Sequence, residues 1–174
     1  MSSTGIVRRI DELGRLVIPK EMRKRFHLVE GDSVEFVVND KQEIVIRKYS
    51  VLEPWEHITQ KILSTLAKHT QNPVFLMNNE YLIQASREVH EDYLNKKLHE
   101  NFLRNAIVYT NQQFTNVVLF VNEEVIVSGY VFPVVIHGDW IASFVLIESR
   151  EKISEDDVKV MDAFRNYFVY TMEG

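Results

Sequence analysis

The chain of 174 residues contains no cysteine, and this absence excludes several kinds of site at once. Without thiols there is no disulfide, no thiolate ligand for zinc and no cysteine nucleophile. Long apolar runs are missing as well, since no stretch approaches the roughly 20 residues that a membrane-spanning helix needs. The first fifteen residues lack the apolar run of a signal peptide. These absences predict a soluble cytoplasmic protein that has no membrane partner.

Motifs of the common catalytic and cofactor sites are also missing. The chain has no glycine-rich phosphate loop, no dinucleotide fingerprint and no nucleophile elbow. Its six histidines form no array with the spacing of a zinc site. The adjacent Asp156 and Asp157 follow Ser154 at a predicted helix start, where carboxylates favour the positive end of the helix dipole. We therefore expect no enzyme activity, no metal and no cofactor.

Charge is distributed unevenly along the chain, although the net charge is −5. Residues 1–25 carry seven basic and three acidic side chains, whereas residues 51–174 carry ten basic and seventeen acidic ones. Such asymmetry is expected when one domain contacts phosphate and the other does not; a solvated basic surface is the alternative. The candidates for contact with double-stranded DNA are Arg8, Arg9, Arg15, Lys20, Arg23, Lys24 and Arg25.

The first 50 residues predict two hairpins separated by a short helix. Polar and glycine-containing turns interrupt β-rich runs, and Pro19 both ends a strand and favours a helix start. The predicted strands are 6–10 and 15–18, then 33–38 and 43–48, with the helix at 20–26. So small a unit, without cysteine or metal ligands, buries too little apolar surface to fold alone. We therefore predict that it dimerises.

The same residues resemble the AbrB family of bacterial transition-state regulators. The matching string is TGIVRRIDELGR at 4–15, then VIPKE at 17–21 with Arg23, then EGD at 30–32. The resemblance implies an intertwined dimer in which two copies swap hairpins to form one small β-barrel. It also implies that the basic residues beside the first turn and on the short helix face DNA. Some members of the family carry a second domain and regulate sporulation genes.

The candidate DNA-binding side chains differ in how freely they can point outward. Arg8 and Arg9 are adjacent on a strand and therefore leave opposite faces. Arg15 follows Gly14 at the end of a turn, where we expect its side chain to project from the barrel. The three basic residues at 23–25 fan over about 200° of the helix, so which of them faces DNA stays open.

A second domain is predicted after a linker at residues 51–55. Residues 56–174 show apolar patterns in the order helix, hairpin, helices, strand meander and final helix. The predicted helices are 55–69, an irregular region at 87–113 and a last helix after Ser154; the strands are 74–77, 81–84, 117–121, 125–136 and 140–148. This order resembles a GAF domain, which implies an antiparallel sheet with flanking helices. The fold class is α+β.

These observations predict a DNA-binding, nucleoid-associated transcription regulator, with sporulation as the setting that the resemblance implies. We expect a dimer through the N-terminal barrel, and a tetramer through the first and last helices of the second domain. Trp55, Ile58, Ile62, Phe164 and Phe168 supply apolar surface for that second contact.

Two other functions stay open. The GAF-like domain could bind an unknown small-molecule effector that controls DNA affinity instead of serving for oligomerisation. Its aromatic residues are then candidates for a pocket lining, or else for the core: Phe75, Tyr81, Phe120, Tyr130, Phe132, Trp140 and Phe144. An antitoxin with a similar swapped barrel is less favoured, because such proteins end in a disordered tail and residues 55–174 have the pattern of a folded domain.

Overall fold

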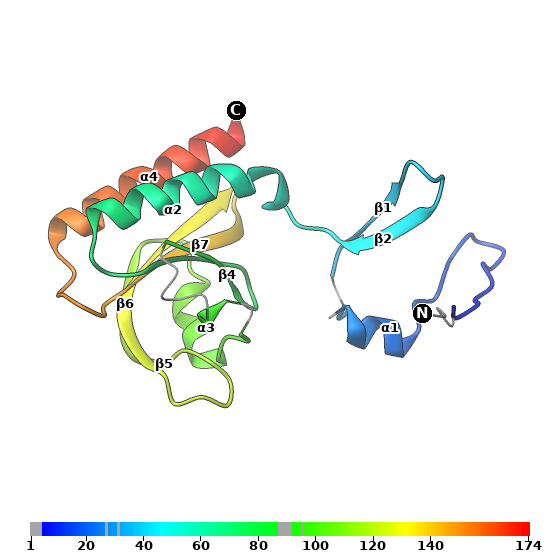
Figure 1. Ribbon diagram of the computed structural model, residues 1–174, viewed down its shortest axis with the longest axis horizontal. Coiled ribbons are helices and arrows are strands. Elements are labelled where there is room, and N and C mark those ends of the chain that lie inside the picture. Colours follow the sequence, from blue (N-terminus) through cyan, green and yellow to red (C-terminus); the bar gives the residue numbers. More distant parts are fainter. Residues whose placement is uncertain (1–4, 27, 31, 87–91, 95) are drawn as a thin grey trace. The chain divides into compact units, whose positions relative to one another are not determined.

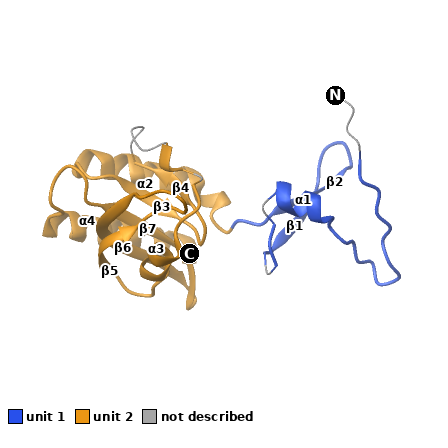
Figure 2. Cartoon of the chain, turned by 90° about the horizontal axis from the view of Figure 1, so that it is seen from below, with its two compact units in different colours: residues 1–50 blue, residues 51–174 orange. Residues whose placement is uncertain are grey.

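The computed structural model describes residues 5–26, 28–30, 32–86, 92–94 and 96–174. The chain forms two compact units, which are coloured separately in Figure 2. Unit 1 comprises residues 1–50 and unit 2 residues 51–174. Figure 1 labels the helices and strands of each unit.

Unit 1 contains one short helix and one hairpin among its described residues. Helix α1 spans Lys20–Arg25, and strands β1 (Val34–Val38) and β2 (Ile44–Lys48) pair antiparallel. Asn39 forms the hairpin tip, where its Oδ1 accepts hydrogen bonds from the backbone N–H of Lys41 at 3.0 Å and of Glu43 at 2.9 Å. The predicted helix and second hairpin are confirmed.

The first predicted hairpin forms its turn but not its strands. Gly14 N–H donates to the Asp11 carbonyl at 2.9 Å, and Asp11 N–H donates to the Arg15 carbonyl at 3.2 Å. Residues 6–10 and 15–18 are nevertheless not strands in the single chain, contrary to the sequence prediction. A strand requires a neighbour to pair its N–H and C=O groups. No described residue of the same chain occupies that place.

Apolar side chains of unit 1 are uncovered. Val7 is 86% exposed, Phe36 65% and Ile44 70%. Pro19 is the one fully buried residue among those described in this unit. Unit 1 of a single chain therefore lacks a hydrophobic core.

Unit 2 is an antiparallel five-stranded sheet with the order β4-β3-β7-β6-β5. The strands are β3 (Val74–Met77), β4 (Leu82–Ala85), β5 (Gln112–Val118), β6 (Ile126–Ile136) and β7 (Asp139–Ile147). The 3-10 turn η1 (Glu53–Trp55) precedes helix α2 (Glu56–His69), and helices α3 (Glu100–Ala106) and α4 (Glu155–Glu173) follow. This α+β arrangement is as predicted and is consistent with a GAF-like fold.

Helices cover both faces of this sheet. Helices α2 and α4 pack side by side on one face and α3 packs on the other (Figure 1). Side chains alternate along β3, so that Leu76 joins the cluster under α2 and α4 while Phe75 and Met77 join the cluster under α3. All three are fully buried. Unit 2 thus has two cores, one on each face of the sheet.

The β6–β7 hairpin forms where the sequence His137-Gly138-Asp139 indicates a turn, but its central pair is His137-Gly138 rather than Gly138-Asp139. Both residues have positive φ, 51° for His137 and 90° for Gly138, as a two-residue turn of type I′ requires. Gly129 on β6 is also required, because a Cβ there would lie 2.0 Å from the Leu146 carbonyl oxygen.

The region 87–113 differs from its prediction as mainly helical. Its described part contains a single α-helix, α3, while residues 87–91 and 95 lie outside the described residues. Strand β5 begins at Gln112, five residues before the predicted strand 117–121. The reason is tertiary pairing with β6, which places Phe114 in the core against Phe102 with ring centroids 5.4 Å apart.

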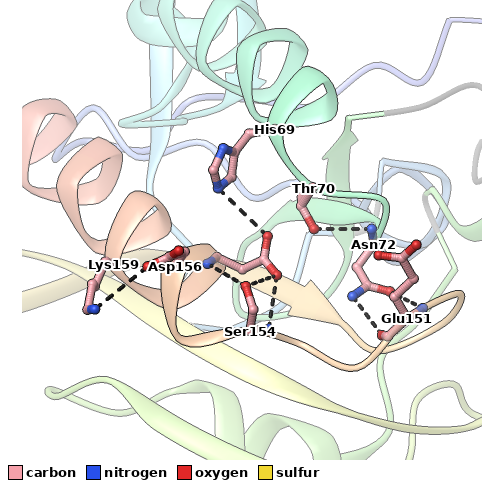
Figure 3. Close-up of polar contacts among 8 residues, drawn as sticks. His69, Thr70, Asn72, Glu151, Ser154, Asp156 and Lys159 are labelled. Carbon is pink, nitrogen blue, oxygen red and sulfur yellow. Dashed lines mark hydrogen bonds and ion pairs between the residues drawn. The ribbon is translucent and has the colours of Figure 1, made fainter.

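Helix α4 begins with a capping box that the sequence predicted only in part. Ser154 Oγ accepts from Asp157 N–H at 3.1 Å, and Asp157 Oδ2 accepts from Ser154 N–H at 3.0 Å. Burial raises the pKa of Asp157, but hydrogen bonds from Ser154 and Thr70 and the nearby His69 outweigh it, so this pKa lies below its ordinary value. These contacts join the end of α2 to the start of α4 (Figure 3).

Asn72 holds the loop before α4 in place (Figure 3). Its Oδ1 accepts from three successive backbone N–H groups, those of Ser149 at 3.0 Å, Arg150 at 3.1 Å and Glu151 at 3.4 Å. Its Nδ2 donates to the Glu151 carbonyl at 2.9 Å. Because Asn72 is only 1% exposed, water cannot easily replace these bonds.

Replacing Asn72 by Ala should therefore destabilise unit 2. The substitution removes four hydrogen bonds made by a buried side chain, and we expect the free energy of unfolding to fall by about 2–5 kcal/mol. Asn166→Ala is the matched control, because this exposed side chain donates one hydrogen bond, to Asp162 at 3.2 Å. The free energy of unfolding should fall by no more than about 0.5 kcal/mol in this variant. Urea denaturation measures the free energy of unfolding of both variants. Equal losses of this free energy would contradict the role of Asn72.

Candidate nucleic-acid interface

The side chains of unit 1 that are predicted to contact DNA lie on two neighbouring segments of the chain. One is the turn with its flanks, and the other is helix α1. All seven residues predicted to contact DNA are exposed: Arg8, Arg9, Arg15, Lys20, Arg23, Lys24 and Arg25. Exposure leaves their charges available to a partner outside the chain.

Helix α1 begins after Pro19 and concentrates its positive charge in its last turn. Arg23 N–H donates to the Pro19 carbonyl at 2.9 Å, which closes the first turn. Arg23, Lys24 and Arg25 then occupy the last turn, where cations are favoured by the negative end of the helix dipole. The Arg25 guanidinium lies 5.9 Å from the ring centroid of Phe26, so part of its orientation is set within the chain.

The turn between Asp11 and Arg15 is closed by one carboxylate. Asp11 Oδ1 accepts from the backbone N–H of Leu13 at 3.0 Å and of Arg15 at 2.8 Å. Asp11 Oδ2 accepts from Arg15 Nε at 2.6 Å. The same carboxylate therefore fixes both the backbone of the turn and the side chain of Arg15.

Gly14 completes this turn with a φ of +75°. No heavy atom lies within 4 Å of the place where a Cβ would be, so there is space for a side chain. The requirement for glycine is conformational, because other residues adopt this left-handed region only at a cost.

The Asp11 carboxyl has a pKa below its ordinary value. The hydrogen bond from the Arg15 backbone N–H is the largest cause, followed by the Arg15 side chain. Both favour the ionised carboxylate. The Asp11 carboxylate is therefore ionised at neutral pH and supplies the negative charge of the ion pair with Arg15.

This geometry adds one residue to the candidate site. The side chain of Arg15 is 72% exposed, and its Nε is held by Asp11. Asp11 itself was read from the sequence only as a turn residue. Its spacing of four residues from Arg15, across a turn that contains Gly14, was the signal that could have identified the pair.

The charged side chains of unit 2 are mainly acidic, with seventeen acidic against ten basic, and its aromatic candidates are mostly core. Phe75, Phe120, Phe132 and Phe144 are each no more than 1% exposed and pack in the two cores. In the part of the chain that the structure describes, His, Asp and Glu form no group of three that could hold a metal ion. None of the described helices is long and apolar enough to cross a membrane.

Comparison with known proteins finds similarity to the N-terminal unit and to the whole chain. Residues 7–52 match the family model described as "Antidote-toxin recognition MazE, bacterial antitoxin". Stage V sporulation protein T of Bacillus subtilis (strain 168) is 29% identical over 179 residues, which cover 99% of this chain and 99% of the relative.

Two relatives match the N-terminal part only. Transition state regulatory protein AbrB of the same organism is 51% identical over 49 residues, 28% of this chain and 50% of the relative. Putative transition state regulator Abh is 47% identical over 49 residues, 28% of this chain and 52% of the relative. The chain thus spans about half the length of each.

One solved structure, described as the solution structure of the N-domain of the transcription factor abrB, is 50% identical. It covers 29% of this chain and 94% of that chain, with a TM-score of 0.26.

Proposed function

Because the N-terminal unit is a domain of the MazE/AbrB type, as its residues predicted, we propose that this chain is a DNA-binding transcription regulator. The observation that carries the proposal is the set of exposed basic side chains on the turn and on α1 of that domain. Their charge can neutralise phosphates, and their arginines offer planar donors that fit a phosphate or a guanine edge. The acidic unit 2 is then free of DNA.

A second copy of the chain is part of this proposal. Segments 6–10 and 15–18 have β-rich sequences without strand partners, and apolar residues such as Val7 and Phe36 are uncovered. Swapping hairpins with a second copy pairs the strands and buries the apolar side chains in one step. The resulting barrel presents two turns and two α1 helices to DNA.

Unit 2 has the role of a second oligomerisation contact in this proposal. Ile62 and Phe168, expected to contribute to that contact, are instead 4% and 0% exposed within the unit's own core. An uncovered aromatic surface lies on α4, where Tyr167 is 57% and Tyr170 77% exposed. This surface lines a hollow of about 490 Å³ at the end of the helix. We infer that a second unit 2 covers it and that two dimers form a tetramer.

Gene control during sporulation is the proposed setting. The support is the match with Stage V sporulation protein T, which extends over both units and 99% of each chain. A regulator of this kind acts at the nucleoid, in the cytoplasm.

Two alternative functions receive less support. The family model for residues 7–52 describes an antitoxin, but unit 2 is a folded domain with two cores of its own. A small-molecule sensor would require a pocket in unit 2, where four of the seven aromatic candidates are packed in the core. Oligomerisation is therefore preferred as the role of unit 2.

Native mass spectrometry of the full chain tests the oligomer. Two independent contacts, one in each unit, should give a tetramer, and Tyr167→Glu combined with Tyr170→Glu should reduce it to a dimer, because charge opposes burial of this surface. Lys159→Glu, near the start of the same helix, should leave the tetramer intact. A wild-type chain that is dimeric at every concentration would refute the second contact.

The DNA interface is tested by replacing single arginines with Ala. We expect Arg8→Ala, Arg15→Ala and Arg23→Ala each to weaken DNA binding in a salt titration, with circular dichroism unchanged. Loss of a phosphate contact should reduce the salt slope by about one per contact in each bound copy. Loss of a base contact should remove about 1–3 kcal/mol of discrimination at one position.

Arg150→Ala is the control for these variants. Arg150 lies in the acidic unit 2, and its backbone N–H, which the substitution keeps, is the group that Asn72 binds. DNA affinity should not change. If Arg150→Ala weakens binding as much as Arg15→Ala does, the DNA-binding face has been assigned to the wrong unit.

A further inference from the structure

We propose that Asp11 is a positioning residue that presents the guanidinium of Arg15 end-on to DNA. The inference rests on the proposed function of the same surface and extends it to an acidic residue. Asp11 holds Arg15 twice, through the backbone N–H at 2.8 Å and through Nε at 2.6 Å. An arginine that is held at both its backbone N–H and its guanidinium has few remaining side-chain orientations.

The contact determines which edge of the guanidinium stays available. Arginine has five N–H donors in one plane, and Asp11 engages the one on Nε. The four on Nη1 and Nη2 donate to no described residue. These two nitrogens form the end of the fork, which can make two parallel bonds to a pair of acceptors.

DNA offers such acceptor pairs in two places. The O6 and N7 atoms of guanine lie side by side in the major groove, and each phosphate carries two unesterified oxygens. An arginine already fixed in its bound orientation loses less rotamer freedom on binding than a mobile one. The turn therefore orients the guanidinium of Arg15 before DNA binds.

Electrostatics alone predicts the opposite role for Asp11. A carboxylate beside a DNA-binding arginine repels phosphate and reduces the positive charge of the surface. Its removal should then strengthen binding. Removal of the Asp11 carboxylate should therefore weaken DNA binding if Asp11 positions Arg15, and strengthen it if only the charge of Asp11 matters.

Asp11→Asn separates the contact to Arg15 from the shape of the turn. The amide oxygen can still accept from the backbone N–H groups of Leu13 and Arg15, as asparagine does in turns of this kind. The amide NH₂ cannot accept from Nε, so the head of Arg15 is released. Thermal melting should show that the fold is unaffected.

Glu12→Gln is the matched control. Glu12 is the next residue, is exposed and makes no hydrogen bond or ion pair with a described residue. Its substitution removes the same charge without touching Arg15. Any change that it causes is the contribution of charge alone.

The probe is a duplex selected from a random pool by the full-length wild-type chain, with a scrambled duplex of equal length beside it. We expect Asp11→Asn to bind the selected duplex about fivefold more weakly than wild type, and Glu12→Gln to bind it at least as tightly as wild type. Loss confined to the selected duplex assigns Arg15 to a base edge. Equal loss on both duplexes assigns it to phosphate.

Arg15→Lys provides a second measurement that does not depend on how Asp11→Asn folds. Lysine keeps the charge but lacks Nε and the planar fork. The Arg15→Lys variant should lose as much DNA affinity as the Asp11→Asn variant. The double variant should bind DNA no more weakly than Arg15→Lys alone. Asp11→Asn that binds as tightly as Glu12→Gln overturns the inference. If Arg15→Ala itself leaves DNA affinity unchanged, the proposed interface has failed instead.

Discussion

Unit 1 cannot bury its own apolar side chains, and both the proposed assembly and the proposed DNA binding follow from this constraint. Its described residues contain one helix of six residues and one hairpin. Two more segments have the composition of strands but no partner. Water contact with so many apolar side chains opposes folding, and a second copy removes it. In the proposed assembly, the turn and α1 form within each copy, and the second copy supplies the apolar partner surface that unit 1 lacks.

Unit 2 meets the opposite condition. Its sheet is covered on both faces, and its phenylalanines are packed inside. It leaves an aromatic surface exposed on α4. The two units also divide the charge, with the basic residues concentrated before residue 26. These differences suit the proposed regulator, in which the basic unit 1 dimerises and binds DNA while the acidic unit 2, which has its own cores, provides a second oligomer contact.

Features that depend on local chemistry were predictable from the sequence. The presence of a turn between β6 and β7, the start of α4 after Ser154 and the hairpin around Asn39 follow from residues with narrow conformational preferences. Features that depend on distant partners were not. Strand β5 begins earlier than its apolar run suggested because it pairs with β6. Within the candidate site, the basic residues were evident from charge, whereas the role of Asp11 required knowing that its carboxylate meets Nε of Arg15.

Sedimentation and circular dichroism of residues 1–53, followed together on dilution, test the central claim most directly. If a second copy completes the barrel, the fragment is a dimer with strand signal at high concentration. On dilution its mass and its strand signal should fall together, because a separated copy has no core. A fragment that keeps its strand signal as a monomer at micromolar concentration would show that one chain can complete the unit, and would contradict the account.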